Sequence, residues 1–178
     1  SWESCYQLCH DVYLECAQCE YLRGNTAESE RLFDILISRS GSELDKADVY
    51  GLKMQLYAGT GKYDVAVQIG LNALKELGVK LPAKPGIMDN ARELALYKWL
   101  MRNKSIHDLI DLPEMENPVQ KKVAQLYISL IFSTCLGYPD LYSHIIIKAG
   151  NHALKYGITE IASIGYIGYG ITEGSVLG

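Results

Sequence analysis

The sequence predicts an all-α protein built as a right-handed array of about four helix hairpins. Three observations support this fold class. Apolar residues recur at steps of three and four along most of the 178 residues, which is the period of an α-helix that buries one side. Short turns that contain glycine separate the helical stretches, and no run of alternating residues indicates a strand. We therefore expect one helical-repeat domain over residues 1–178.

Two hairpins are predicted within residues 1–78. Cysteine and valine residues at helical spacing predict a first helix, which ends at the Gly24-Asn25 turn. Ser42 is the expected N-cap of the third helix, and Gly78 follows the last turn of the fourth. The four helices are expected over residues 1–23, 26–40, 43–58 and 62–77.

Residues 79–117 are predicted to form an irregular connector that contains one longer helix. Pro82 and Pro85 prevent a continuous helix at its start. Asp89 is the expected N-cap of a helix that ends near Met101. A short helix is expected over residues 106–110.

Residues 118–178 are predicted to form a further hairpin and a truncated last repeat. Asn117-Pro118 places a cap residue before a proline at the first helical position, and that helix is expected to reach Leu136. The following helix is expected over residues 139–156, and a last one from near Thr159 towards the chain end.

Short strings recur along the chain. The turn glycines Gly24 and Gly61 are 37 residues apart, and residues 69–75 and 149–155 share Gly, Ala, Leu and Lys at identical spacing. The first hairpins resemble the tetratricopeptide repeat, in which small residues at fixed positions let neighbouring helices approach. Gly70 departs from that pattern, which usually has a bulky aromatic there, so we expect an irregular array. The matching positions are Tyr50, Tyr57, Gly61, Tyr63, Ala66, Ala73 and Leu74.

The connector sequences carry a more specific resemblance. The strings over residues 73–82 and 105–118 are similar to the helical segment of large multidomain signalling ATPases. Those proteins join a Ser/Thr-kinase-like domain, an AAA-type ATPase domain, this helical segment, and GAF and histidine-kinase modules. The resemblance implies a non-catalytic interaction and signal-relay segment of a longer chain. It implies no catalytic residue and no cofactor within residues 1–178.

Composition and charge exclude several classes. The formal net charge of −4 argues against a nucleic-acid partner, because the net field mildly repels phosphate. The apolar run over residues 161–171 is too short to span a bilayer. No signal peptide is visible, so we expect a cytoplasmic protein. The chain has no initiator Met, so it is expected to be a piece of a longer protein whose truncated repeat could self-associate.

Four of the five cysteines lie on the first predicted helix, beside His10. Cys5 and Cys19 would be about 21 Å apart along one helix, so all four thiols cannot reach one zinc ion. We therefore expect a stripe of small, buried thiols. A metal-binding helical protein, with Cys5, Cys9, Cys16, Cys19 and His10 acting in part, is retained as an alternative function.

Three further groups are read as structural. The acidic residues Asp108, Asp111, Glu114 and Glu116 are expected on a solvated face. The glycine-rich string over residues 168–174 lacks the spacing and the lysine of a phosphate-binding loop. His144 and His152 share a helix face but have no third ligand, so no metal site is expected there.

The tyrosines provide the candidate interaction residues. There are 13 Tyr and only 2 Phe, and a tyrosine buries its ring while its hydroxyl finds a polar partner. They are expected either between helices or at the edge of a concave peptide-binding face. A free-standing adaptor that binds a peptide or a helix is therefore the other alternative function. The candidate residues for such a surface are Tyr13, Tyr50, Tyr57, Asn72 and Lys75.

Overall fold

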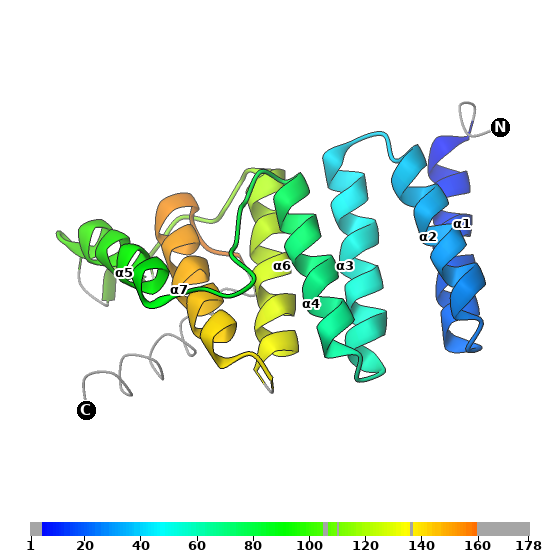
Figure 1. Cartoon of the computed structure of the whole chain (residues 1–178). Coiled ribbons are helices and arrows are strands. Elements are labelled where there is room, and N and C mark those ends of the chain that lie inside the picture. Colours follow the sequence, from blue (N-terminus) through cyan, green and yellow to red (C-terminus); the bar gives the residue numbers. More distant parts are fainter. Residues whose placement is uncertain (1–4, 105–106, 110, 136, 160–178) are drawn as a thin grey trace. The chain divides into compact units, whose positions relative to one another are not determined.

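The structure is a computed structural model that describes residues 5–104, 107–109, 111–135 and 137–159. It divides into two compact units, Ser1–Leu77 (unit 1) and Gly78–Gly178 (unit 2), which are described separately. All secondary-structure elements of the described residues are helices, so the all-α prediction is confirmed (Figure 1). The right-handed superhelical course stays a prediction, and the last expected helix lies mostly in 160–178, outside the described residues.

Among the described residues, unit 1 contains four helices and unit 2 contains three, together with one short 3₁₀ turn at His107–Leu109. The helices of unit 1 are α1 (Tyr6–Leu22), α2 (Thr26–Arg39), α3 (Glu43–Gly59) and α4 (Tyr63–Glu76). Those of unit 2 are α5 (Ile87–Met101), α6 (Pro118–Thr134) and α7 (Pro139–Tyr156).

The expected helix starts are confirmed at two caps and wrong at a third. Ser42 Oγ accepts the Asp45 N–H at 3.1 Å, and Asn117 caps α6. Asp89 is not the N-cap of its helix as expected, because the helix starts at Ile87 with Gly86 as its N-cap. Asp89 is the third helical residue, and its carboxylate accepts the Gly86 N–H at 2.8 Å. An acidic side chain in a first turn stabilises a helix from either position, which explains the error.

Unit 1 repeats the same hairpin with a period of 37 residues. Adding 37 to the bounds of α1 and α2 reproduces the bounds of α3 and α4. The turns also match, because Gly24 and Gly61 both have a positive φ, of 83° and 77°. The residue after each glycine donates its N–H to the carbonyl five residues before it. Asn25 donates to Glu20 at 2.9 Å, and Lys62 donates to Tyr57 at 3.0 Å. The expected repeat is therefore exact at the level of helix ends and turns.

One core cluster of unit 1 lies where α1, α2 and α3 meet. Phe33 and Leu36 of α2 are fully buried with Ala17 of α1 and Val49 of α3. Small residues let the first two helices approach, since Ser29 is buried and its hydroxyl donates to the Ala17 carbonyl at 2.8 Å. Ser29 stands where the tetratricopeptide pattern has alanine, and this bond satisfies its buried hydroxyl.

The core of unit 2 lies mainly between α6 and α7. Val123, Leu130 and Ile145 are fully buried there. The chain before α6 is held by an isolated bridge to the chain after α7. Met115 N–H donates to the Ile158 carbonyl at 2.8 Å, and Ile158 N–H donates to the Pro113 carbonyl at 2.9 Å. The connector is thereby tied to the end of the last described helix.

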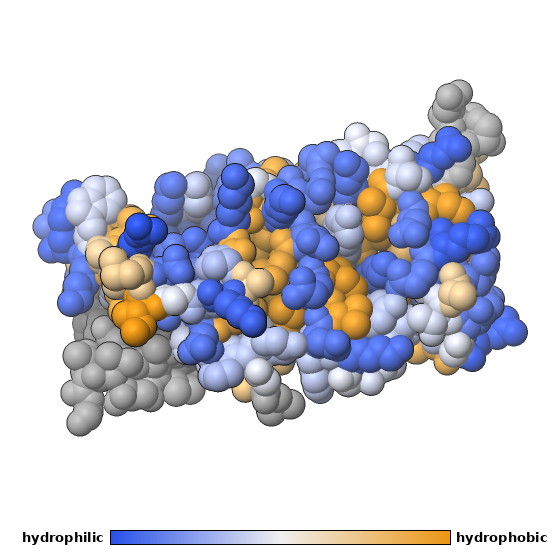
Figure 2. Space-filling model, viewed as in Figure 1, coloured by the Kyte–Doolittle hydropathy of each residue, from blue (hydrophilic) through white to orange (hydrophobic). Residues whose placement is uncertain are grey.

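Helix α5 packs against α7 through polar side chains. His144 Nδ1 donates to Asn90 Oδ1 at 2.7 Å, and Lys148 pairs with Glu93 at 2.7 Å. No side chain of α5 is fully buried. Four apolar residues of α5 are exposed, and apolar surface is visible at the α5 end of the view in Figure 2. They are Ile87, Met88, Leu96 and Trp99.

Candidate interaction surface

The repeat of unit 1 carries identical polar side chains at exposed positions. Asp11 and Gln18 of α1 correspond to Asp48 and Gln55 of α3, each pair 37 residues apart. Three of the four side chains are exposed, and Gln18 is half-buried. Packing constrains the side-chain type little at the three exposed positions. These four residues are called here the Asp/Gln stripe.

The geometry of the Asp/Gln stripe follows from the helix period. Within each helix Asp and Gln are seven residues apart, nearly two full turns, so they lie on one side about 10.5 Å apart. An extended peptide advances about 3.3 Å per residue, so three of its residues match this spacing. Carboxylate oxygens accept hydrogen bonds, and the Gln amide both donates and accepts. Asp11 already accepts from Gln7 Nε2 at 2.9 Å, which orients its carboxylate.

Two of the expected site residues, Tyr13 and Tyr50, are equivalent in the repeat and half-buried. Each follows its stripe aspartate by two positions, a rotation of about 200° that places it on the other side of the helix. Tyr13 packs against the core of unit 1. Burial raises the pKa of the Tyr50 phenol, and the Glu76 carboxylate raises it further. These surroundings are those of helix packing.

Tyr57 is only 6% exposed and lies inside the helix packing of unit 1. Its hydroxyl donates to Glu30, and its ring lies 5.1 Å from that of Tyr21. The ammonium of Lys62 lies 5.5 Å from the Tyr57 ring centroid. Burial, and then the bond to Glu30, raise the pKa of Tyr57. Of the two positions expected for the tyrosines, Tyr57 occupies the one between helices, because its polar partner comes from α2.

Asn72 and Lys75 are exposed on α4. They lie three residues apart on one side of that helix. The structure therefore brings neither of them onto the side of α3 that carries Asp48 and Gln55. Sequence reasoning missed the Asp/Gln stripe, although the tripeptide Asp-Val-Tyr at residues 11–13 and 48–50 was a visible signal.

The expectation of a buried cysteine stripe is wrong. Cys5, Cys16 and Cys19 are exposed, and Cys9 is half-buried. The residue that α1 buries beside them is His10, at 8% exposure. The helix is rotated so that Ala17 and Tyr21 face the core instead of the thiols. In the part of the chain that the structure describes, no group of three or more His, Cys, Asp or Glu residues is arranged to hold a metal ion.

The two histidines of α7 bind different neighbours. His144 bonds to Asn90 of α5, whereas His152 Nε2 donates to the Gln120 carbonyl of α6 at 3.1 Å. Burial lowers the pKa of both imidazoles. They are interhelix packing residues. The acidic residues expected on a solvated face are exposed, as predicted: Asp108, Asp111, Glu114 and Glu116. The glycine-rich string over 168–174 lies outside the described residues.

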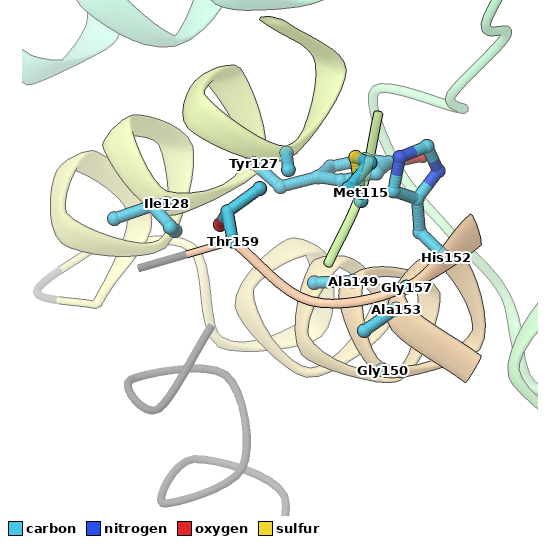
Figure 3. A pocket seen from close by; sticks show the side chains of 10 residues that line it. Met115, Tyr127, Ile128, Ala149, Gly150, His152, Ala153, Gly157 and Thr159 are labelled. Carbon is cyan, nitrogen blue, oxygen red and sulfur yellow. The ribbon is translucent and has the colours of Figure 1, made fainter. Parts of the chain in front are cut away.

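A small apolar cavity lies between α6, α7 and the bridged segments (Figure 3). Met115, Tyr127 and His152 line it, and its volume is about 30 Å³. Binding sites for small molecules usually enclose about 300–1,000 Å³, so this cavity is a packing gap of about one water molecule. It gives unit 2 no small-molecule site of ordinary size.

Part of the chain is similar in sequence to a signalling protein. Over 80 residues, 45% of the chain, it is 28% identical to the hybrid signal transduction histidine kinase G of Dictyostelium discoideum. The chain spans only 2% of the length of that protein. No family model matches the chain, and no solved structure matches it. No helix of the described residues is both long enough and apolar enough to cross a membrane. The described part of the chain is thus helical, and the chain has weak similarity to a signalling protein.

Proposed function

We propose that the chain is a non-catalytic protein–protein interaction and signal-relay segment of a larger signalling protein. Two findings support this proposal. The matched relative is a signal transduction histidine kinase of which the chain spans a very small part. Unit 1 is a hairpin repeat, an architecture that presents side chains of successive helices as one extended surface.

The observation that carries the proposal is the Asp/Gln stripe. Its Asp and its Gln each recur 37 residues later in hairpins that otherwise share few residues, and three of these four side chains are exposed. Acidic residues outnumber basic ones within residues 5–77. The partner that fits is therefore an extended peptide segment with basic side chains, whose backbone bonds to the Gln amides and whose charges meet Asp11 and Asp48.

A selection of peptides from a random displayed library on the full chain tests this function. We expect the enriched peptides to carry Lys or Arg and to bind with a Kd in the micromolar range. The double variant Asp11→Ala/Asp48→Ala should weaken their binding by about tenfold or more, because each charge-assisted hydrogen bond is worth roughly 1.5–3 kcal/mol.

The matched control is Asp34→Ala, which removes the same charge from an exposed position on α2. It should leave the Kd of the selected peptides nearly unchanged. Enriched peptides that bind the double variant as tightly as the unaltered chain would contradict the proposed surface. A selection that enriches no peptide would contradict the proposed peptide-binding function.

A further inference from the structure

The 37-residue repeat assigns a second surface, on a different side of α1 from the Asp/Gln stripe. In unit 1 one side of α3 is covered by the first hairpin. Val49 is fully buried there, and Leu52 and Leu56 pack partly buried on the same core. Lys53 pairs with Glu30 of α2, and Thr60 shares a hydrogen bond of 2.6 Å with Tyr21 of α1.

The positions that correspond to this covered side lie on α1 and are open. Val49, fully buried, corresponds to Val12, which is 50% exposed. Asp45, which accepts from Tyr6, corresponds to Leu8, which is 65% exposed. The remaining positions are exposed as well. We call the set the outer face of α1: Leu8, Val12, Glu15, Cys16, Cys19 and Arg23.

We propose that the outer face of α1 is the docking site for a further α-helical hairpin, which packs on α1 as the first hairpin packs on α3. The argument is continuity with an interface that the structure shows. The same helix, with the same bounds 37 residues later, buries the same side against a preceding hairpin. Leu8 and Cys16 stand in the places of Asp45 and Lys53, and Glu15 and Arg23 stand in the places of Leu52 and Thr60, so each face carries two charged residues.

The side chains on this face define what the occupant must carry. Glu30 pairs with Lys53 in the observed interface, where the Glu30 side chain is 35% exposed. Cys16 stands in the place of Lys53 and would leave an acid at that point half-buried and without a cationic partner. The occupant therefore has an apolar residue there. The chain's own first hairpin carries Glu30 instead, so self-stacking of two copies is disfavoured.

The native thiols provide the test. A second copy of residues 5–41 is fused to the N-terminal side of the chain that begins at Cys5. Gly41 of the copy then precedes Cys5, just as Gly41 precedes Ser42 in the original chain. The copy carries Glu30→Leu and has its own cysteines changed to alanine. Labelling by a maleimide, mapped by mass spectrometry, then reads only the chain's own thiols. We expect labelling of Cys16 and Cys19 to slow by about tenfold or more, while exposed Cys135 in unit 2 reacts as before.

Matched variants identify the face. Val12→Glu in the receiving chain should restore fast labelling, whereas Phe132→Glu, an exposed apolar position on α6, should leave the protection intact. A copy that keeps Glu30 should protect less well than the Glu30→Leu copy. These readouts do not involve Asp11 or Asp48, so a failure here is distinct from a failure of peptide binding.

Three outcomes would overturn the proposal. Equal labelling rates in the fusion and in the chain alone would show that the hairpin does not dock. An added hairpin that stays unfolded in the fusion would also show that it does not dock, because an isolated helix hairpin becomes stable only when it packs on a neighbouring surface. Slow labelling of Cys16 and Cys19 in the chain without the added hairpin would also refute the proposal. If that protection grows with protein concentration, a second copy covers the face. If it does not, the chain itself covers the face.

Discussion

At the residue scale, Gly157 is a position that does not accommodate a side chain. Its φ is +99°, and a Cβ there would lie 2.3 Å from the Pro113 carbonyl oxygen. That carbonyl accepts the Ile158 N–H in the bridge that ties the connector to α7. Neither the backbone conformation nor the space accommodates a side chain, so a glycine is required at the end of this helix.

We expect Gly157→Ala to reduce the free energy of unfolding by about 2–4 kcal/mol, because the variant combines backbone strain with displacement of the bridge. The measurement is urea unfolding followed by circular dichroism. Gly51→Ala is the control, since Gly51 lies within α3 and a Cβ there meets nothing within 4 Å. It should stabilise the chain by about 0.5–1 kcal/mol through helix propensity. A Gly157→Ala protein as stable as the original would contradict the close approach.

At the element scale, the start of α6 depends on one side chain. Asn117 Oδ1 accepts the N–H groups of Val119 at 2.9 Å and Gln120 at 3.2 Å. These are two of the donors that a helix leaves unsatisfied at its first turn. Asn117→Ala should therefore cost about 1 kcal/mol of stability. Asn117→Asp should retain most of it because aspartate caps equally well, and urea midpoints of both variants check this order.

The contacts of α7 with α5 and α6 predict a pH dependence. Burial lowers the pKa of His144, with Lys148 adding to the effect, and burial also lowers the pKa of His152. The unfolded chain therefore binds protons more readily than the folded chain near pH 6.5. Stability is fully present above that pH and is lost as the pH falls below it.

Urea midpoints at pH 7.5 and 5.5 test this prediction, because both values lie above the usual pKa range of carboxyl groups. The midpoint should be lower at pH 5.5. The double variant His144→Asn/His152→Gln should lose less stability between the two pH values, although it starts from a lower midpoint. An equal loss in the variant and the original chain would mean that other groups cause the dependence.

At the scale of the whole molecule, each compact unit has fully buried side chains of its own. Phe33 is fully buried among residues of α1, α2 and α3, whereas Leu130 and Ile145 are buried within unit 2. Phe33→Ala should cost about 3–5 kcal/mol. Hydrogen exchange should then show lost protection in α1 to α4 and retained protection in α6 and α7. Equal loss in both units would show that they unfold as one cooperative structure.

Much of the fold could be predicted from the sequence, because helix ends depend on local chemistry. The bounds of α7, the caps at Ser42 and Asn117, and the glycine turns at residues 24 and 61 follow from residue types that act within a few positions. The 37-residue spacing of the turn glycines already implied the hairpin repeat. The N-cap of α5 lies three residues before the expected one, because Asp89 stabilises the first turn from inside the helix.

Which side of each helix is buried was decided only by the tertiary structure. The cysteine stripe of α1 has the spacing of a buried face, yet it is exposed, and His10 and Ala17 face the core instead. Periodicity predicts that a helix has an apolar side, but not which neighbour covers that side. Tyr57 is buried for the same reason, because its partner Glu30 comes from another helix. The sequence by itself determined the helices and their repeat, and the tertiary structure decided which surfaces remain open, because burial depends on contacts between residues far apart in the chain.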